Sequence, residues 1–169
     1  MTDKRVLELT KECKRQEESC AYTAAGLYIW QKRSRFWKSL FIVAPIILGG
    51  IATSQILTDL QHAWAPLIAA SLALLAGFFP ALYEALGMNL RVSEIGASAA
   101  EFTNLRDRFR QMATVHSHSD YEEFRSAFEQ LMDRMDAART SSKPLPEWCF
   151  KEARKKIEAG DYSFEVDEK

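Results

Sequence analysis

The sequence is poor in the residue groups on which most enzymes and metal sites depend. Among 169 residues there are three cysteines, three histidines and seven glycines. No CxxC, HExxH or glycine-rich phosphate loop is formed from them, and no nucleophile stands beside a base in a known motif. We therefore expect a chain that is not an enzyme and that holds neither a cofactor nor a metal.

His116 and His118 come nearest to a metal site, because imidazole is a common zinc ligand. They lie two residues apart in the run VHSHSD, and no third ligand follows at a matching spacing. An ordinary polar turn is the favoured explanation of the pair. No metal is predicted there.

An excess of positive charge is also missing. The formal net charge is −1, and no basic stripe lies outside one short region described below, so nucleic acid is not an expected partner. Cys13 and Cys20 lie seven residues apart on one helical face, roughly 10 Å along the axis, which is too far for a disulfide. They are expected to be reduced core residues, together with Cys149.

What the sequence does contain is a long region that is almost free of charge. Its ionisable groups between Leu40 and Leu86 are Asp59, His62, Tyr83 and Glu84. Residues 40–57 and 65–82 are each 18 residues without a charge, and Tyr83 to Leu86 extend the second run. A hydrocarbon core needs about 20 such residues. We predict transmembrane spans at about 40–57 and 65–86.

Two buried core helices of a soluble protein are the alternative to these spans. That alternative is disfavoured because both runs are apolar on all sides and follow each other directly. The expected fold is all-α: a two-span transmembrane helical hairpin with a long cytoplasmic helical bundle. The chain then divides into an amphipathic cytoplasmic helix (1–38), the hairpin (39–86), further cytoplasmic helices (87–139), and a linker, short helix and acidic tail (140–169).

Flanking basic residues predict how the hairpin is oriented, because lysine and arginine are retained in the cytoplasm during insertion. The segment TDLQHAW between the spans contains neither residue. Both termini are therefore expected in the cytoplasm. The membrane-orienting residues are Lys32, Arg33, Arg35, Lys38 and Arg91.

The second span has a small residue at every fourth position. These residues predict a helix-packing groove, since small residues let helices approach closely in lipid: Ala65, Ala69, Ala73, Gly77, Ala81 and Ala85. The groove could face the chain's own first span, which offers Gly49, Gly50 and Ala52, or another subunit. Both alternatives stay open from sequence alone.

Polar residues within the spans are candidates for the lining of a pore, because desolvating them is costly. They are Thr53, Ser54, Gln55 and Glu84. Glu84 is near the predicted inner end of its span, where reaching interfacial water is the simpler explanation.

Three charged segments outside the spans have apolar residues at helical spacing. The first runs from Val6 to Leu27 and leads into the first span, the second runs from Val92 to Met112, and the third from Tyr121 to Ala138. Ser119 and Glu122 predict a capping box for the third helix. We expect the three stripes to be buried against one another or against other subunits, with Phe102, Phe109, Phe124 and Phe128 in the bundle core.

The remaining segment contains a predicted linker and a short last helix. TSSKPLP, residues 140–146, has the serine and proline content of a linker. A helix over Trp148–Ala159 should follow and end at Gly160. Pro45 and Pro80 are expected to kink the spans.

The order of these elements resembles the SLATT family, the two-transmembrane effectors of bacterial conflict systems. The similarity covers nearly the whole chain and includes the ending KPLPEWCFKEARKKIEAGDY, where Trp148, Ala153, Ile157 and Gly160 look like that family's closing helix. The resemblance implies a homo-oligomer that permeabilises the bacterial inner membrane, in an antiphage role, when a nucleotide-signalling or sensor protein gives a cytoplasmic signal.

Two functions are therefore carried forward. The first is the oligomeric, membrane-permeabilising effector, for which the lipid bilayer is a partner. The second is a membrane-tethered scaffold that binds a cytoplasmic partner through its helical bundle and forms no pore. Two helices alone cannot enclose a water-filled path in lipid, so the first function needs several chains.

Overall fold

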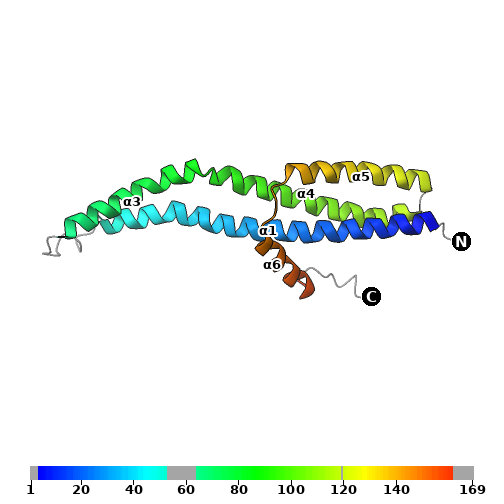
Figure 1. Cartoon of the computed structure of the whole chain (residues 1–169), viewed down its shortest axis with the longest axis horizontal. Coiled ribbons are helices and arrows are strands. Elements are labelled where there is room, and N and C mark those ends of the chain that lie inside the picture. Colours follow the sequence, from blue (N-terminus) through cyan, green and yellow to red (C-terminus); the bar gives the residue numbers. More distant parts are fainter. Residues whose placement is uncertain (1–3, 53–63, 119, 162–169) are drawn as a thin grey trace. The chain divides into compact units, whose positions relative to one another are not determined.

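A computed structural model describes residues 4–52, 64–118 and 120–161 of the chain (Figure 1). In chain order, the helices of the described part are α1 (Lys4–Ala52), α3 (Ala65–Ala85), α4 (Met88–Thr114), the 3-10 helix η1 (His116–His118), α5 (Tyr121–Ser141) and α6 (Glu147–Glu158). No strand occurs in these ranges. The all-α prediction is confirmed for the described residues.

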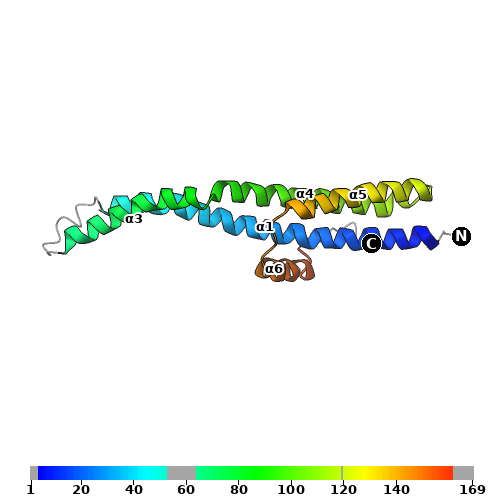
Figure 2. The same ribbon diagram turned by 45° about the horizontal axis from the view of Figure 1, so that its top comes forward.

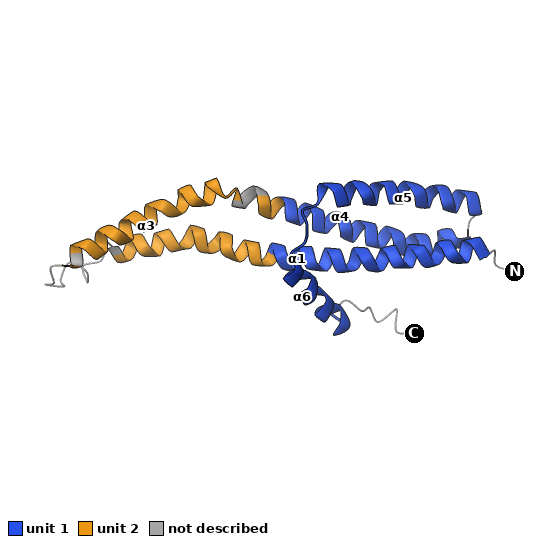
Figure 3. Cartoon of the chain, in the orientation of Figure 1, with its two compact units in different colours: residues 1–31, 94–169 blue, residues 32–93 orange. Residues whose placement is uncertain are grey.

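The chain divides into two compact units (Figure 3). Unit 1 contains residues 1–31 and 94–169, and unit 2 contains residues 32–93. Helix α1 contributes to both, because it is one helix of 49 residues. The expectation that the N-terminal amphipathic helix runs into the first apolar segment is confirmed.

Unit 1 is built on a core formed by α1, α4 and α5 (Figures 1 and 2). Each helix contributes one apolar stripe at three-and-four spacing, so the three stripes can meet. The expected alternative of burial against other subunits is not needed, since the stripes bury each other within one chain. The buried members include Cys13, Cys20, Ala24, Leu27, Ile95, Ala99, Phe102, Leu105, Phe109, Met112, Phe124, Leu131, Met135 and Ala138.

Contacts between the ends of the helices give the directions in this bundle. Arg5 near the start of α1 lies 4.4 Å above the ring of Tyr121, the first residue of α5. Lys143, just after α5, pairs with Glu94 near the start of α4. Helix α5 therefore runs parallel to α1 and antiparallel to α4.

Polar and sulfur contacts reinforce the packing of α5. The Arg134 guanidinium donates to both Glu101 carboxylate oxygens of α4, at 2.7 and 3.0 Å, and this bond lowers the pKa of Glu101. The Cys20 thiol of α1 lies 3.7 Å from the Met135 sulfur. Burial raises the pKa of Cys20 to about 11 and that of Cys13 to about 12, so both thiols are protonated at neutral pH.

The start of α5 differs from its predicted capping box. Asp120 is the N-cap, and its Oδ2 accepts a hydrogen bond from the Glu122 backbone N–H at 3.1 Å. A carboxylate satisfies an exposed N–H there and also favours the positive end of the helix dipole, as the Ser119 hydroxyl could not. The capping box of Ser119 and Glu122 was therefore wrong, and Ser119 lies outside the described residues.

The end of α5 and the last helix also refine the prediction. Helix α5 continues through Thr140 and Ser141, so the connection to α6 is residues 142–146, shorter than the predicted linker of residues 140–146. Helix α6 begins at Glu147, one residue before the predicted start. Gly160, at φ 86°, donates to the Ile157 carbonyl at 3.0 Å, and the Asp161 N–H donates to that of Lys156 at 3.1 Å. These two bonds form a Schellman motif, in agreement with the expected glycine stop.

Helix α6 packs on α1 through small and aromatic residues. Cys149 and Ala153 are fully buried, and the rings of Tyr22 and Phe150 have centroids 6.0 Å apart. Just before α6, the Leu145 side chain occupies the place where a Cβ at position 26 would stand. Because Gly26 has no side chain, the connection can approach the α1 backbone closely.

Unit 2 contains the last part of α1, α3 and the first residues of α4 (Figure 3). Its two long helical segments lie side by side in both views, and the rings of Phe41 and Phe79 have centroids 5.5 Å apart. Half-buried residues recur every three or four positions on each segment: Ser34, Lys38, Phe41, Pro45 and Leu48 on α1, where the neighbouring Ala44 and Gly49 are half-buried too, and Ala69, Leu72, Ala76, Phe79 and Tyr83 on α3. We call these two rows the seam. Their spacing is typical of coiled-coil packing.

Gly87 separates α3 from α4. Its φ of 56° is left-handed, which an L side chain rarely adopts, and its N–H donates to the Glu84 carbonyl at 2.9 Å. Pro66 stands in the first turn of α3, where the missing N–H is tolerated. Pro45 and Pro80 both lie inside continuous helices.

The core of unit 1 gives a stability prediction. Phe109 is fully buried and meets the Phe128 ring edge to face, with centroids 6.2 Å apart. Phe109→Ala should lower the free energy of unfolding by about 3 to 5 kcal/mol through lost contacts and a cavity. Thermal unfolding of the purified full chain, followed by circular dichroism, measures this effect.

Phe150→Ala is the matched control, because the same atoms are removed from a ring that is 46% exposed. It should lower the unfolding midpoint much less than Phe109→Ala. Equal midpoints for both variants would show that the α1–α4–α5 core is not the main source of stability.

Candidate functional site

The apolar surface of unit 2 is its most unusual feature. The two helices that contain it, α1 and α3, are long and apolar enough to cross a membrane. No residue of either apolar window is buried within the structure. Ile46 is 72% exposed, Leu67 70% and Phe78 69%. A core helix of a soluble protein would have such side chains covered, so this surface needs a covering that the single chain does not supply.

The small residues of α3 lie mostly away from the seam. Ala69 is half-buried, whereas Ala73, Gly77, Ala81 and Ala85 are exposed. A Cβ added at Gly77 would meet no atom within 4 Å. The side chain of Ala65 is outside the described residues.

Helix geometry explains why the groove and the seam lie on different sides of α3 over most of its length. A step of four residues turns about 400°, so each small residue is displaced by about 40° from the one before. The seam alternates steps of three and four and stays on one side of the helix. The two rows therefore share Ala69 and then diverge. The groove is turned away from α1 over most of its length.

The glycines of the first apolar segment do not fill the groove either. Cβ atoms added at Gly49 or Gly50 would meet nothing within 4 Å. The close backbone approach that small residues permit is therefore not made between α1 and α3 at these positions. Of the two partners considered for the groove, the chain's own first span does not occupy it in this structure.

The predicted pore-lining residues are only partly visible. Thr53, Ser54 and Gln55 lie outside the described residues. Glu84 is exposed on α3 and makes no ion pair with any described residue. The Ser71 hydroxyl donates to the Leu67 carbonyl at 2.8 Å, so its polar group is satisfied within the helix. The Tyr83 hydroxyl is buried without a hydrogen-bond partner among the described residues.

The membrane-orienting residues fall in one part of unit 2. Lys32, Arg33, Arg35 and Lys38 lie within two turns of α1, and Arg91 lies in the first turn of α4. All are exposed except Lys38, which is half-buried. Phe36 and Trp37 stand among them, 65% and 44% exposed.

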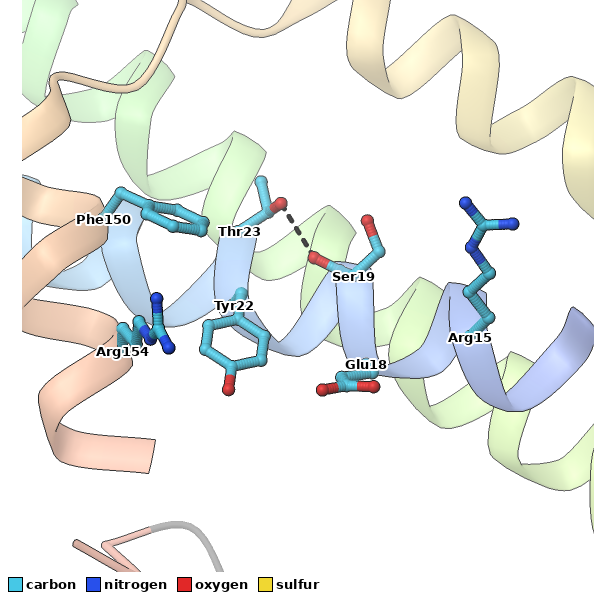
Figure 4. A pocket seen from close by; sticks show the side chains of 7 residues that line it. All are labelled: Arg15, Glu18, Ser19, Tyr22, Thr23, Phe150 and Arg154. Atoms are coloured by element: carbon cyan, nitrogen blue, oxygen red, sulfur yellow. Dashed lines mark hydrogen bonds between the residues drawn. The ribbon is translucent and has the colours of Figure 1, made fainter. Parts of the chain in front are cut away.

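Unit 1 contains an open pocket of about 400 Å³ that sequence reasoning missed (Figure 4). Its lining combines Arg15, Glu18, Ser19, Tyr22 and Thr23 of α1 with Phe150 and Arg154 of α6. No sequence motif predicts this pocket, because its lining residues come from two helices whose packing depends on Gly26 and Leu145. The signal in the sequence is limited to aromatic and arginine residues on the polar face of α1.

The pocket can offer ring faces and guanidinium groups to a ligand. Arg154 lies beside the Tyr22 ring, but its Nε donates to Glu158 at 2.8 Å, and Arg15 is within 3.8 Å of Glu12. The Thr23 hydroxyl donates to the Ser19 carbonyl at 2.9 Å. Most of the charge is thus compensated, and the pocket has no arrangement of a nucleophile and a base.

The other sequence candidates are placed as follows. Phe102, Phe109 and Phe124 are buried in the core of unit 1, and Phe128 is partly buried against it. His116 and His118 form η1, and among the described residues no three metal-ligating side chains come together.

Comparisons of the chain with models of protein families, with curated proteins and with solved structures gave no match. The resemblance to the SLATT family therefore stays a prediction based on the order of elements and the closing segment.

The exposed groove yields a test. Ala73→Leu with Gly77→Leu should leave the monomer's stability unchanged, since nothing lies near Gly77, but should reduce oligomer size by filling the groove. Size in detergent or nanodiscs, measured by light scattering, follows the assembly. Ser71→Leu adds bulk at an exposed position that is turned about 120° from Gly77 and lies outside the groove, so this variant should assemble normally. Normal assembly of both variants would mean that the groove faces lipid.

Proposed function

We propose that this chain is a membrane effector that oligomerises in the bacterial inner membrane and permeabilises it in response to a cytoplasmic signal. The observation that supports this proposal best is the exposed apolar surface of α1 and α3, on helices of membrane-spanning length.

The energetics of the exposed side chains favour lipid as their covering. Fully burying a leucine, isoleucine or phenylalanine side chain is worth about 1.5–3 kcal/mol. Large apolar residues point outward along both helices, including Ile42, Val43, Ile46, Ile47, Leu67, Leu74, Leu75 and Phe78. A bilayer covers all of them at once, whereas a protein partner would cover one side. The chain then forms a transmembrane hairpin with both termini in the cytoplasm.

Assembly follows from the number of spans. Two helices cannot enclose an aqueous path, because their outer surfaces must stay apolar in lipid. The groove of α3 is turned away from α1, so a helix of another subunit can approach there. This arrangement supports a homo-oligomer and explains why the small residues do not follow the seam.

A signal would have to act on the cytoplasmic bundle. Helix α1 takes part in the core of unit 1, lines the pocket beside α6 and continues without interruption into the apolar segment. A partner that altered the packing of α1 would thus act on the same helix that enters the membrane. The resemblance to the SLATT family suggests a nucleotide-signalling or sensor protein as that partner.

A scaffold without a pore is the second candidate, and one observation favours it. In the described parts of the two apolar segments, Glu84 is the sole charged residue, so no row of charges marks a water-filled path. In that case the spans only anchor the chain, and the bundle binds the partner.

The proposed topology is testable with reporters fused before Met1 and after Lys169. Because lysine and arginine are retained inside, both fusions should give cytoplasmic signals, such as fluorescence from a green fluorescent protein. A periplasmic signal, such as active alkaline phosphatase, at either end would overturn the two-span topology.

Permeabilisation is measured by following membrane potential with a dye after induced expression. The unaltered chain should depolarise cells, and a version with scrambled spans should not. The variant with Ala73→Leu and Gly77→Leu should insert without depolarising cells, while the Ser71→Leu variant should act as the unaltered chain. If the chain binds its activating partner and the potential still holds, the scaffold function is the correct one.

A further inference from the structure

The basic end of unit 2 differs from the rest of the molecule in its charge balance. Its described residues include five cations, Lys32, Arg33, Arg35, Lys38 and Arg91, against one carboxylate, that of Glu84. In unit 1, by contrast, many cations are paired, as in Arg134 with Glu101, Lys143 with Glu94 and Arg125 with Glu129. Lys32, Arg35, Lys38 and Arg91 make no ion pair with any described residue.

These cations occupy a short length of the helix axis, similar to the thickness of the headgroup layer of a bilayer. Lys32 and Lys38 are six residues apart, about 9 Å along the axis of α1. The polar headgroup region on one side of a bilayer is of about that thickness. Unit 2 begins at Lys32 and ends at Ser93, so Arg91 lies at the same end of this unit.

The angular positions of the cations around α1 favour a lipid layer over a protein partner as their binding partner. At about 100° per residue, Lys32, Arg35 and Lys38 follow one another at about 60°, and Arg33 lies on the far side of Lys32. The cations together cover more than half of the circumference of α1. A folded partner would contact one face, whereas headgroups can reach every side of the helix that α3 leaves open; of the cations on α1, Lys38 alone lies in the seam and is half-buried.

Two aromatic residues strengthen this distinction. Phe36 and Trp37 lie within the same two turns, are exposed, and have ring centroids 6.1 Å apart. Aromatic rings are favoured at the level of the headgroups, where an apolar ring body meets a polar layer. An acidic protein surface would leave the Phe36 ring in water.

We infer that residues 32–38 and Arg91 form a binding surface for anionic phospholipid headgroups, so that the protein selects anionic over zwitterionic lipids in the leaflet that its basic end enters. The inference rests on the proposed membrane function and adds a lipid requirement to it. The same charges orient the hairpin only while it inserts. Headgroup binding would persist after insertion, in the assembled protein. Salt should weaken the selection, because exposed charges are screened.

The test uses the full chain reconstituted into vesicles of phosphatidylcholine and phosphatidylglycerol in equal amounts. Electron paramagnetic resonance of a spin-labelled form of each lipid gives the fraction that the protein immobilises. The unaltered chain should immobilise phosphatidylglycerol in preference, by up to about fivefold for each cation that meets a headgroup, and less at high salt. Lys32→Gln with Arg35→Gln and Lys38→Gln should lower the preference several-fold, because only Arg33 and Arg91 of the five cations remain.

Two controls have matched chemistry. Lys4→Gln with Lys14→Gln and Lys155→Gln removes the same charge from exposed positions in unit 1 and should keep the preference. Lys32→Arg with Arg35→Lys and Lys38→Arg keeps the charge. This variant should also keep the preference for phosphatidylglycerol. Equal loss in the Lys4, Lys14 and Lys155 variant would show a net-charge effect and overturn the inference.

The two levels of the proposal can fail separately. If the unaltered chain does not insert into vesicles of either lipid, the proposed membrane function is wrong. If it inserts but immobilises both lipids equally at low salt, only the headgroup inference is overturned, and an acidic partner is the alternative use of the cations. If the triple glutamine variant inserts poorly, the preference of the unaltered chain and its salt dependence decide the question.

Discussion

One helix has to bury its apolar residues in two different environments, and the rest of the structure depends on this constraint. In its first part, α1 has a narrow apolar stripe between charged residues, which α4 and α5 cover. In its last part it is apolar on all sides, and α3 covers it only along the seam. The basic and aromatic residues from Lys32 to Trp37 mark the change. The division of the molecule into two units follows from that change in pattern.

The bundle of unit 1 is complete in itself. Its three stripes cover one another, many of its charged residues form exposed ion pairs, and the buried thiols of Cys13 and Cys20 are protonated. Exposed ion pairs add little to stability, so the core is the main stabilising feature. The apolar stripes of unit 1 are therefore covered within one chain, whereas the apolar surface of α1 and α3 is left exposed.

Residue periodicity predicted most of the fold. The stripes from Val6, Val92 and Tyr121 are buried, and the two apolar runs form exposed helices, because these features depend on local spacing. Boundaries that depend on competing local hydrogen bonds were less accurate: Asp120, rather than Ser119, caps α5, and Thr140 continues it. The contact of Leu145 with Gly26, and hence the pocket, could not be predicted, since it depends on residues far apart in the chain.

In the candidate site, too, some features could be predicted from local spacing and others could not. The small residues of α3 were identified from spacing, but only coordinates could show that Phe79 and Leu72 follow the seam while Gly77 and Ala81 lie outside it. Two rows with different periods coexist on one helix. One suits a neighbour at a shallow left-handed crossing, and the other suits a right-handed one.

The buried thiols have a practical consequence. All three cysteines of the chain are buried, and the raised pKa values of Cys13 and Cys20 keep the nucleophilic thiolate scarce at neutral pH. The native protein therefore offers no exposed cysteine that would compete with one introduced at the surface. A single cysteine introduced on α3 would be the dominant target of a maleimide probe, so the surroundings of this helix could be followed without replacing a core residue.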